Sequence, residues 1–360
     1  MVILLIVIAL AITVWFALTW FRLKPYNQGA LRIKTFDGSN SPYHPSVLYF
    51  KDGWNGYKYW MVETPFSPKG KPYEDRNECP SIHVSNDGIN WKEIIENPID
   101  DLTDKEVEDL DYFSDPHLVF VNGRIECWYR FTHRNGIKDN YYNLQLVRRI
   151  SKDGVTWSER EVMVNLSTKE GNPLGNMVVS PAIIYQNGIY RMWYVNSESR
   201  RSRGFSYSES TDGKNWTEQS PCILNRSGYM PWHIDVNYID GVYFLISYDF
   251  EDITMWSSSD GLEFSYKRLL AQTSVPGSFY SYKLYRACLI KDKNYKLYFS
   301  ANDSLRTYIG LMEGNGVNSL KIKAIGSHQS FIGLLVYLLI TKWRTTRFIV
   351  RRLIKAIFKK

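Results

Sequence analysis

One short motif, S-x-D-G-x-x-(W/F), recurs four times and restricts this chain more than any other feature of its sequence. Its Asp-Gly pair is typical of a tight turn that needs a positive φ, and we expect its aromatic residue to pack back on a sheet. Four chance matches in 360 residues are improbable, so we treat the motif as a structural repeat. The copies span Ser85–Trp91, Ser151–Trp157, Ser210–Trp216 and Ser258–Phe264.

A second repeat alternates with the first and consists of a short apolar strand, a turn and an aromatic strand. In three copies, seven positions separate the first residue from the turn glycine, which is Gly123, Gly188 or Gly241. Looser copies begin at Pro45, with a longer turn, and at Ala287, where no glycine closes the turn. Aromatic residues make up 15% of the chain, which favours strands over helices. Five such units, with a third strand ending in the S-x-D-G motif, predict an all-β chain folded as a five-bladed β-propeller.

On these features, residues 40–305 resemble the five-bladed β-propeller clan of invertase-, levansucrase- and arabinanase/β-xylosidase-like glycoside hydrolases. The resemblance rests on the x-Pro strand openings, the aromatic second strands and the S-x-D-G-x-x-W turns. It implies that the residues opening the innermost strands surround a central funnel. It also implies three carboxylates there. They are a nucleophile or base on blade one, an aspartate in Asp-Pro on blade two, and a glutamic acid on blade three.

The repeat places one ring residue in each blade, directly before the strand opening. Asp115-Pro116 matches the blade-two aspartate of the clan. His44 stands where the clan has its nucleophile or base, and Ser180 stands where it has its acid, so the chain diverges at the catalytic positions. The two carboxylates that ordinary glycoside hydrolysis requires are therefore missing from their usual place. The five ring residues are His44, Asp115, Ser180, His233 and Arg286.

Asp115, His233 and Asp235 are our candidate catalytic residues. Asp235 lies two positions beyond His233 and therefore on the same side of its strand. A carboxylate beside a histidine fixes its tautomer and stabilises the imidazolium, so this pair could serve as an oriented general base. The alternatives are structural: Asp115 would cap a strand end or pair with Arg130, and His233 would be a core histidine with a satisfied partner.

Our candidate substrate-binding residues are His44, Glu78, Ser180, Trp232 and Arg286. A ring of two histidines, one aspartate and one arginine could bind an anionic sugar, with the arginine holding a carboxylate or phosphate through two hydrogen bonds. Glu78 belongs to the loops between second and third strands, which we expect to open on the face of the ring. Its Glu-Cys-Pro context is like that of the invertase acid but lies on another blade, so we treat that match as coincidental. Other charged residues of these loops are Glu63, Asp75, Arg76, His133, Arg134, Glu198, Arg200, Asp249, Glu251 and Asp252.

The remaining composition excludes several classes of site and partner. Histidine and aspartate are metal ligands, but their spacing requires no metal and no H-E-x-x-H motif occurs, so we expect no metal and no cofactor. The four cysteines are scattered, without a C-x-x-C pair, and we expect buried reduced thiols. Eight of the basic residues behind the net charge of +7 fall within Lys342–Lys360, so we expect no nucleic-acid partner.

Both ends of the chain indicate a membrane. Val2–Phe21 is twenty residues without a charge, long enough to cross a hydrocarbon core of ~30 Å. A cleaved signal peptide is the alternative, but a basic start is missing and bulky residues occupy the cleavage position. We therefore predict a transmembrane anchor at 1–24 and a propeller at 25–326. Basic residues follow the anchor and none precede it, which predicts that the propeller faces the cytoplasm.

Residues 327–360 form the third predicted segment, a basic amphipathic helix on the membrane surface. Within Trp343–Lys360, apolar residues share one helical face and are surrounded by arginine and lysine, as in helices that lie on an anionic leaflet. The alternative is a helix that binds a protein partner, as calmodulin targets do.

Three functions are compatible with these observations. The first is a membrane-associated carbohydrate-active enzyme that cleaves or transfers a glycosyl unit in surface-polysaccharide metabolism, on an anionic or lipid-linked glycan. The second is a non-catalytic glycan-binding or scaffold propeller that has lost the hydrolase carboxylates. The third is an interaction platform without a sugar ligand.

Overall fold

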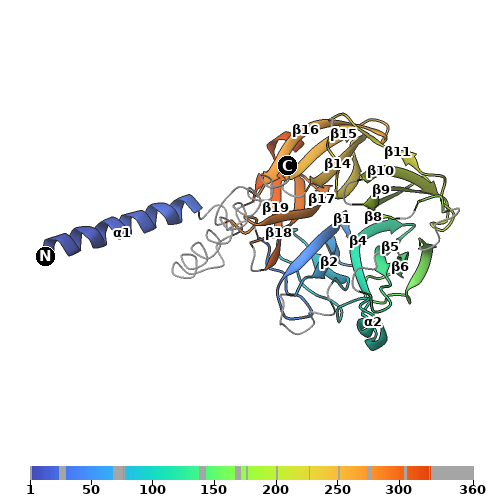
Figure 1. The fold of residues 1–360 in the computed structure, drawn as a ribbon, viewed down its shortest axis with the longest axis horizontal. Coiled ribbons are helices and arrows are strands. Elements are labelled where there is room, and N and C mark those ends of the chain that lie inside the picture. The colour runs from blue at the N-terminus through green and yellow to red at the C-terminus, as the bar shows by residue number, and fades with distance from the viewer. Residues whose placement is uncertain are drawn as a thin grey trace.

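Five β-sheets surround a common centre in this chain (Figure 1). The structure, a computed structural model, describes residues 2–23, 30–67, 76, 78–137, 143–166, 172–175, 177–199, 202–226, 228–249, 252–273, 278–303, 306–323 and 325. The first blade consists of β1 (Pro42–Trp54), β2 (Tyr57–Pro65) and β3 (Ser81–Ser85). The second consists of β4 (Tyr112–Val121), β5 (Arg124–Thr132), β6 (Leu144–Ser151) and β7 (Glu161–Asn165). The third consists of β8 (Val179–Gln186), β9 (Ile189–Ser199), β10 (Ser202–Ser210) and β11 (Ser220–Pro221).

The last two blades complete the circle. The fourth consists of β13 (His233–Ile239), β14 (Val242–Asp249), β15 (Asp252–Ser258) and β16 (Glu263–Gln272), with β12 (Ile223–Leu224) added in parallel to β16. The fifth consists of β17 (Lys283–Lys291), β18 (Tyr295–Asn302), β19 (Thr307–Gly314) and β20 (Lys321–Ile322). The innermost strands β1, β4, β8, β13 and β17 contact one another in this cyclic order, and β17 returns to β1. The predicted all-β, five-bladed propeller is therefore confirmed.

Four of the five inner hairpins are closed by tight turns of two residues that both have positive φ, the geometry that suits the twist of antiparallel strands. The first blade differs from the sequence-based expectation of a longer turn. Its turn is also a residue pair, and the extra residues form an irregularity in β1 between Tyr49 and Trp54. The turn pairs are Asn55-Gly56, Asn122-Gly123, Asn187-Gly188 and Asp240-Gly241.

Each S-x-D-G motif follows the third strand of its blade and is held by its own side chains. In the first copy, Asp87 Oδ1 accepts hydrogen bonds from the amides of Ile89 and Asn90, both at 2.8 Å. The amide of Gly88 donates to Ser85 Oγ at 2.9 Å. The other three copies repeat this network. The turn therefore forms from local contacts alone, as the motif predicts.

The glycine of each motif also packs on an aromatic side chain of the preceding blade. That aromatic residue lies on the second strand, and a Cβ atom added to the glycine would come within 2.0–3.0 Å of its ring or hydroxyl. The motif therefore joins two blades as well as ending a strand. The pairs are Gly154 on Trp60, Gly213 on Trp128, Gly261 on Trp193 and, closing the circle from the first blade to the fifth, Gly88 on Tyr298.

The N-terminal strap, residues 30–40, covers the junction of the first and fifth blades. Ala30 bridges to Gly310 of β19, and the Leu31 amide donates to the Ile309 carbonyl at 2.8 Å. Leu31 and Ile33 are buried in the apolar cluster between these two blades. The strap thus supplies extra pairing to β19 at the point where the ring closes.

Two short helical elements complete the described chain. Helix α2 (Asp104–Glu108) precedes the second blade and begins with a capping box of Thr103 and Glu106, and the 3₁₀ helix η2 (Val317–Ser319) precedes β20. All four cysteines are free, and Cys222 alone among them is half-buried while the others are buried. This confirms the predicted reduced thiols.

The predicted membrane segments have different outcomes. Residues 2–23 form helix α1 (Val2–Leu23), a separate helix outside the five sheets (Figure 1). Among the described residues no helix is both long and apolar enough to span a membrane. The structure therefore does not support the predicted transmembrane helix at 1–24. The predicted amphipathic segment at 327–360 lies outside the described residues.

We expect Gly154→Ala to destabilise the propeller strongly, because φ is +76° there and the new Cβ atom would overlap the ring of Trp60 at 2.0 Å. Backbone strain and overpacking together should cost roughly 2–5 kcal/mol of unfolding free energy, measured by urea denaturation. Gly123→Ala is the matched control, since its φ is +86° but nothing lies within 4 Å of the added atom. That variant should lose only the backbone part, about 1–2 kcal/mol. Equal losses in both variants would contradict the role of the glycine–tryptophan contact.

Candidate functional site

β-Bulges aim four of the five ring residues at the propeller axis. In β1, β4, β8 and β17, the pairing with the second strand shifts at the ring position, between Ser114 and His117 in β4, for example. Strand β13 keeps a regular register, and His233 pairs directly with Tyr248. Bulges of this kind re-aim side chains and are common next to active sites.

Backbone strain is concentrated at the same place. His44, Asp115 and Ser180 have φ values of 50°, 54° and 52°, and Glu78 has a φ of 65°. The other non-glycine residues with positive φ in the described chain are asparagine or aspartate, apart from Leu110. A left-handed backbone costs an ordinary residue about 1–2 kcal/mol, and such outliers are often found at functional sites. We therefore take these four residues as the centre of the candidate site.

Asp115 connects a histidine and an arginine from two blades. Its Oδ1 lies 3.2 Å from Nδ1 of His233, and its Oδ2 accepts a hydrogen bond from Arg130 Nη1 at 2.7 Å. The Ser180 amide also donates to Oδ2, at 3.2 Å. All these side chains are at least nine-tenths buried. Nε2 of His233 is buried and has no hydrogen-bond partner among the described residues, and a buried polar atom of this kind calls for a partner such as water or a ligand.

His44 and Glu78 form the other half of the site. Nδ1 of His44 lies 3.0 Å from Thr64 Oγ1 and 3.7 Å from Oε2 of Glu78. Nε2 of His44 likewise has no hydrogen-bond partner in the described part of the chain. The rings of His44 and His233 are stacked with their centroids 6.1 Å apart. Two imidazoles with unpaired Nε2 atoms therefore lie side by side.

Aromatic side chains line the site. The ring of Tyr285 lies 4.1 Å from that of His233 and 5.1 Å from that of His44, and it stacks on Tyr43. Nε1 of Trp232 donates to Tyr285 Oη at 3.4 Å. Trp232 and Tyr285 are half-buried, and the Glu78 side chain is 16% exposed. These three side chains are thus the part of the site that solvent or a ligand can reach first.

The surroundings of Glu78 and Asp115 shift the pKa values of these two carboxyl groups in opposite directions. Burial, reinforced by the charge of Asp115, raises the pKa of Glu78 to about 8. Burial alone would raise the pKa of Asp115 too, but His233 and Arg130 outweigh it and hold that pKa well below its usual range. At neutral pH the site therefore contains a protonated Glu78 and an ionised Asp115, the kind of split that supports acid–base chemistry.

Both histidines are neutral at pH 7. Burial lowers the pKa of His44 to about 3, although Asp115 opposes the change. Burial also lowers the pKa of His233, against the opposing charge and hydrogen bond of Asp115. A neutral imidazole can accept a proton, which a buried imidazolium cannot.

Asp235 and Arg286 lie together in a second, deeper layer. Arg286 donates to the carbonyls of Pro116 at 2.8 Å and Pro181 at 2.9 Å, so it ties the second and third blades together. Its Nη2 also lies 3.2 Å from Nδ1 of His117. Asp235 Oδ1 is 3.7 Å from that same nitrogen, and burial raises the pKa of Asp235 to about 6.

The structure brings some of the predicted site residues together and separates others. The structure brings Asp115, His233, His44, Glu78 and Trp232 together. Ser180 adjoins them, but its hydroxyl is used between blades, where it donates to the Ile234 carbonyl at 2.9 Å. The carboxylate beside His233 belongs to Asp115. It does not belong to Asp235, the partner predicted from the sequence. Period-two alternation places the neighbour, Asp235, on the same side of the strand but one step further along the axis.

The predicted loop residues are dispersed. Glu63 is completely buried and pairs with His83 at 3.0 Å, and His133 pairs with Asp111 at 2.9 Å. Asp75, Arg200 and Glu251 lie outside the described residues. Of this group, Glu78 is the residue that the structure brings to the ring.

Sequence reasoning missed Tyr43, Thr64, Tyr248 and Tyr285 as members of the site. One signal was present for two of them, because Tyr43 and Tyr285 directly precede ring residues, as Trp232 precedes His233. Thr64 and Tyr248 come from second strands, and no spacing rule in the repeat singles them out. Their positions depend on how the second strand pairs with the first.

His44, Asp115 and His233 are side chains of the kinds that bind transition metals. Within the described ranges, however, no group of three or more histidine, cysteine, aspartate or glutamate side chains is arranged to hold a metal ion.

Comparison with known proteins finds similar chains among enzymes that act on carbohydrates. No protein-family model matches the chain. The A type blood N-acetyl-alpha-D-galactosamine deacetylase of Flavonifractor plautii is 25% identical over 233 residues, which cover 54% of this chain and 29% of that protein. The chain thus spans less than a third of the length of this curated relative.

Solved structures agree with this placement. An N-acetylgalactosamine deacetylase from F. plautii, crystallised with blood group B trisaccharide, superimposes with a TM-score of 0.65 at 19% identity, over 80% of this chain and 94% of that one. A GH43_1 enzyme from Xanthomonas citri, complexed with xylose, gives a TM-score of 0.56 at 11% identity, over 84% and 94%. CoXyl43, a β-xylosidase/α-arabinofuranosidase from a compost metagenome, gives 0.55 at 11%, over 84% and 98%. The predicted resemblance to propeller glycoside hydrolases is confirmed at the level of the fold.

We expect the Glu78 carboxyl group to titrate near pH 8 in a carbon-13 NMR titration of the folded protein. Asp115→Asn should lower the pKa of Glu78, because the negative charge that opposes its ionisation is removed. Asp235→Asn is the control and should leave this pKa unchanged, since Asp235 belongs to the deeper layer. An unshifted Glu78, or equal effects of the two variants, would contradict this electrostatic account.

Proposed function

We propose that this protein is a carbohydrate-active hydrolase that removes the N-acetyl group of an amino sugar. The observation that carries the proposal is the buried His233–Asp115 pair, whose Nε2 is unpartnered among the described residues. A histidine oriented by a carboxylate is suited to activating water, whereas glycoside hydrolysis ordinarily uses two carboxyl groups. The similarity to a deacetylase in both sequence and fold supports the same reaction.

His233 would act as the general base. If Nδ1, which lies 3.2 Å from Asp115 Oδ1, carries the proton, the lone pair of His233 lies on Nε2. Nε2 takes a proton from a water molecule as the water oxygen attacks the acetamido carbonyl carbon. Asp115 stabilises the imidazolium that forms, and Arg130 keeps Asp115 ionised.

Glu78 would act as the general acid. Because its pKa is about 8, it still carries a proton at neutral pH. It gives that proton to the departing nitrogen as the carbon–nitrogen bond breaks. The proton held by His233 then returns through solvent to Glu78. One water is consumed, and the products are acetic acid and the free amine.

His44 would stabilise the oxygen of the acetamido carbonyl. If the Thr64 hydroxyl donates to Nδ1, the His44 proton lies on Nε2, the nitrogen without a described partner. Such a donor can stabilise the negative charge that develops on the carbonyl oxygen during attack. The half-buried rings of Trp232 and Tyr285 offer apolar faces to the sugar.

Glycosyl cleavage or transfer, in surface-polysaccharide metabolism, is the second candidate. The opposed acidities of Glu78 and Asp115 favour it, since glycosidases pair a protonated and an ionised carboxyl group. The two reactions differ in their products. Deacetylation releases acetate and leaves the glycan length unchanged, whereas glycosyl cleavage shortens the glycan.

The decisive assay measures acetate release and glycan length together, on oligosaccharides that end in N-acetylgalactosamine or N-acetylglucosamine. We expect acetate release by the parent protein, and a fall of roughly 10²–10⁴-fold in kcat for His233→Gln and for Glu78→Gln. The rate of the parent should also fall above about pH 8, as Glu78 loses its proton. Reactions are run with a chelator and with added divalent cations, because Asp115 and His233 are of metal-binding types.

Glu263→Gln is the matched control, an exposed glutamate on β16 that should leave the rate unchanged. Glycan shortening without acetate would establish the glycosidase instead. Binding without either product would support the non-catalytic glycan-binding propeller. Acetate release that survives in both His233→Gln and Glu78→Gln would overturn the proposed site.

We also propose that the protein works at a membrane, with the propeller on the cytoplasmic side. Support comes from the charge-free run Val2–Phe21 and from the exposed apolar side chains of α1, such as Leu10 at 59% and Val14 at 53%. The full chain should float with lipid vesicles in a density gradient, and Leu10→Arg combined with Val14→Arg should abolish flotation. Equal flotation of parent and variant would refute anchoring by this segment.

A further inference from the structure

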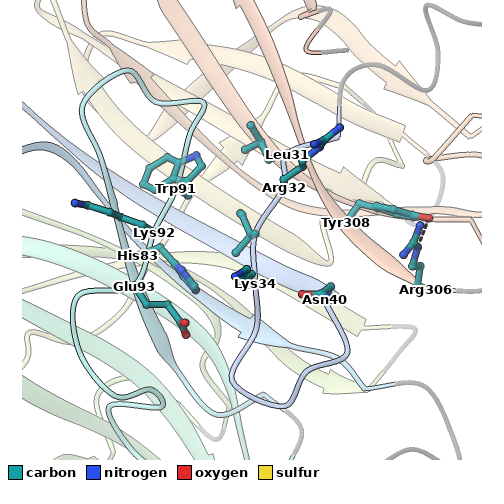
Figure 2. A pocket seen from close by; sticks show the side chains of 11 residues that line it. Leu31, Arg32, Lys34, Asn40, His83, Trp91, Lys92, Glu93, Arg306 and Tyr308 are labelled. Carbon is teal, nitrogen blue, oxygen red and sulfur yellow. Dashed lines mark hydrogen bonds between the residues drawn. The ribbon is translucent and has the colours of Figure 1, made fainter. Parts of the chain in front are cut away.

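A cavity of about 800 Å³ lies away from the candidate site, at the junction of the first and fifth blades (Figure 2). The N-terminal strap forms one wall, β3 and the turn after it form the second, and the start of β19 forms the third. Its lining residues include none of the side chains that form the ring site. The cavity therefore requires an explanation of its own.

Four cationic side chains line this cavity. Arg32 and Lys34 come from the strap, Lys92 from the first blade and Arg306 from the fifth, and all four are exposed. The opposing charge among the lining residues is Glu93, whose Oε1 already accepts a hydrogen bond from Asn97 at 3.1 Å. An excess of cations around a concave surface attracts anionic ligands.

Two of these cations have no carboxylate partner among the residues that the structure describes. Neither Lys34 nor Lys92 forms an ion pair within the part of the chain that the structure describes. Lys92 lies over the ring of Tyr57, with Nζ 5.0 Å from the centroid, and this contact leaves its charge uncompensated. No described carboxylate therefore competes with an anionic ligand for either lysine, and two such charges at one concave surface add to its attraction for anions.

Arg306 is oriented by an aromatic neighbour. Its Nε donates to Tyr308 Oη at 2.6 Å (Figure 2). That hydroxyl donates to Asp303 Oδ2 at 2.6 Å. The guanidinium also lies over the Tyr308 ring, 5.0 Å from its centroid. These contacts fix the orientation of the Arg306 guanidinium, and an oriented guanidinium suits recognition of a carboxylate or phosphate.

Aromatic rings complete the lining. Trp91 from the first blade and Tyr308 from the fifth are both half-buried and line the same cavity. Trp91 is itself braced edge-on by Tyr59 and Tyr298, so its ring is held in place. Rigid aromatic rings beside cations match a ligand that has both an apolar ring face and an anionic group.

We infer that this cavity is a binding site for an acidic saccharide, a sugar that carries a carboxylate or a phosphate. The anionic group pairs with one or more of the cationic side chains Lys34, Lys92 and Arg306, and the sugar ring packs against Trp91 or Tyr308. The assignment does not depend on which bond the ring site cleaves, since the two places share no side chain. The cavity would hold a distant acidic unit of the same glycan or a separate acidic ligand.

The test is isothermal titration calorimetry on the full chain. The probes are trigalacturonate, glucose 1-phosphate, neutral maltotriose and inorganic phosphate. We expect trigalacturonate or glucose 1-phosphate to bind. Binding of the first identifies a carboxylate as the anionic group, and binding of the second identifies a phosphate. Affinity should fall at least tenfold in Lys34→Ala/Lys92→Ala and should weaken as salt is raised from 50 to 500 mM.

Two control variants test whether binding depends on this cavity. Lys51→Ala/Lys267→Ala removes the same charge from exposed positions elsewhere and should leave affinity unchanged. His233→Gln should keep the binding measured here even if it abolishes turnover, so failure of the ring chemistry and failure of this site are distinguishable. Binding of maltotriose or inorganic phosphate as tightly as of the acidic sugars would overturn the inference. Unchanged affinity in Lys34→Ala/Lys92→Ala, or no binding of either acidic sugar, would overturn it too.

Discussion

The packing of a turn glycine on the aromatic ring of the preceding blade is the contact on which this structure depends. Trp60, Trp128 and Trp193 are completely buried, and each is covered by the motif glycine of the next blade. Only glycine combines the positive φ of the turn with the absence of a Cβ atom at that surface. The same residue therefore ends a strand and positions the next blade. Because Gly88 covers Tyr298, this contact also closes the ring.

That closed frame allows the site to hold features that are unfavourable on their own. Three ring residues and Glu78 have left-handed backbones, and Asp115 is an ionised carboxylate in the interior. Arg130 and the Ser180 amide stabilise the carboxylate, and the rings of Tyr285 and His233 pack beside it. A protonated Glu78 and a neutral His233 then follow from burial. The chemistry that we propose depends on these ionisation states and not on any single residue type.

The blades and their turns could be predicted because their signals are local. The S-x-D-G network and the two-residue hairpins form within a few residues, so a repeat in sequence is a repeat in structure. The ring positions could be predicted as well, since they occupy equivalent places in each copy. The partner of His233 could not, because Asp235 and Asp115 both satisfy the sequence rules and only the stacking of layers along the axis separates them. Arg286 likewise occupies a ring position in sequence, yet its guanidinium is used on backbone carbonyls of other blades.

The deeper layer also determines the route by which a polymer can reach the ring. Arg286, His117 and Asp235 are between 1% and 4% exposed, and the arginine bridges two blades across the centre. The axis is therefore closed beneath the ring, and a polymer cannot be threaded through the propeller. A ligand must therefore enter and leave the ring from the same face of the propeller. A polysaccharide that binds there has to lie across that face or insert a unit from it.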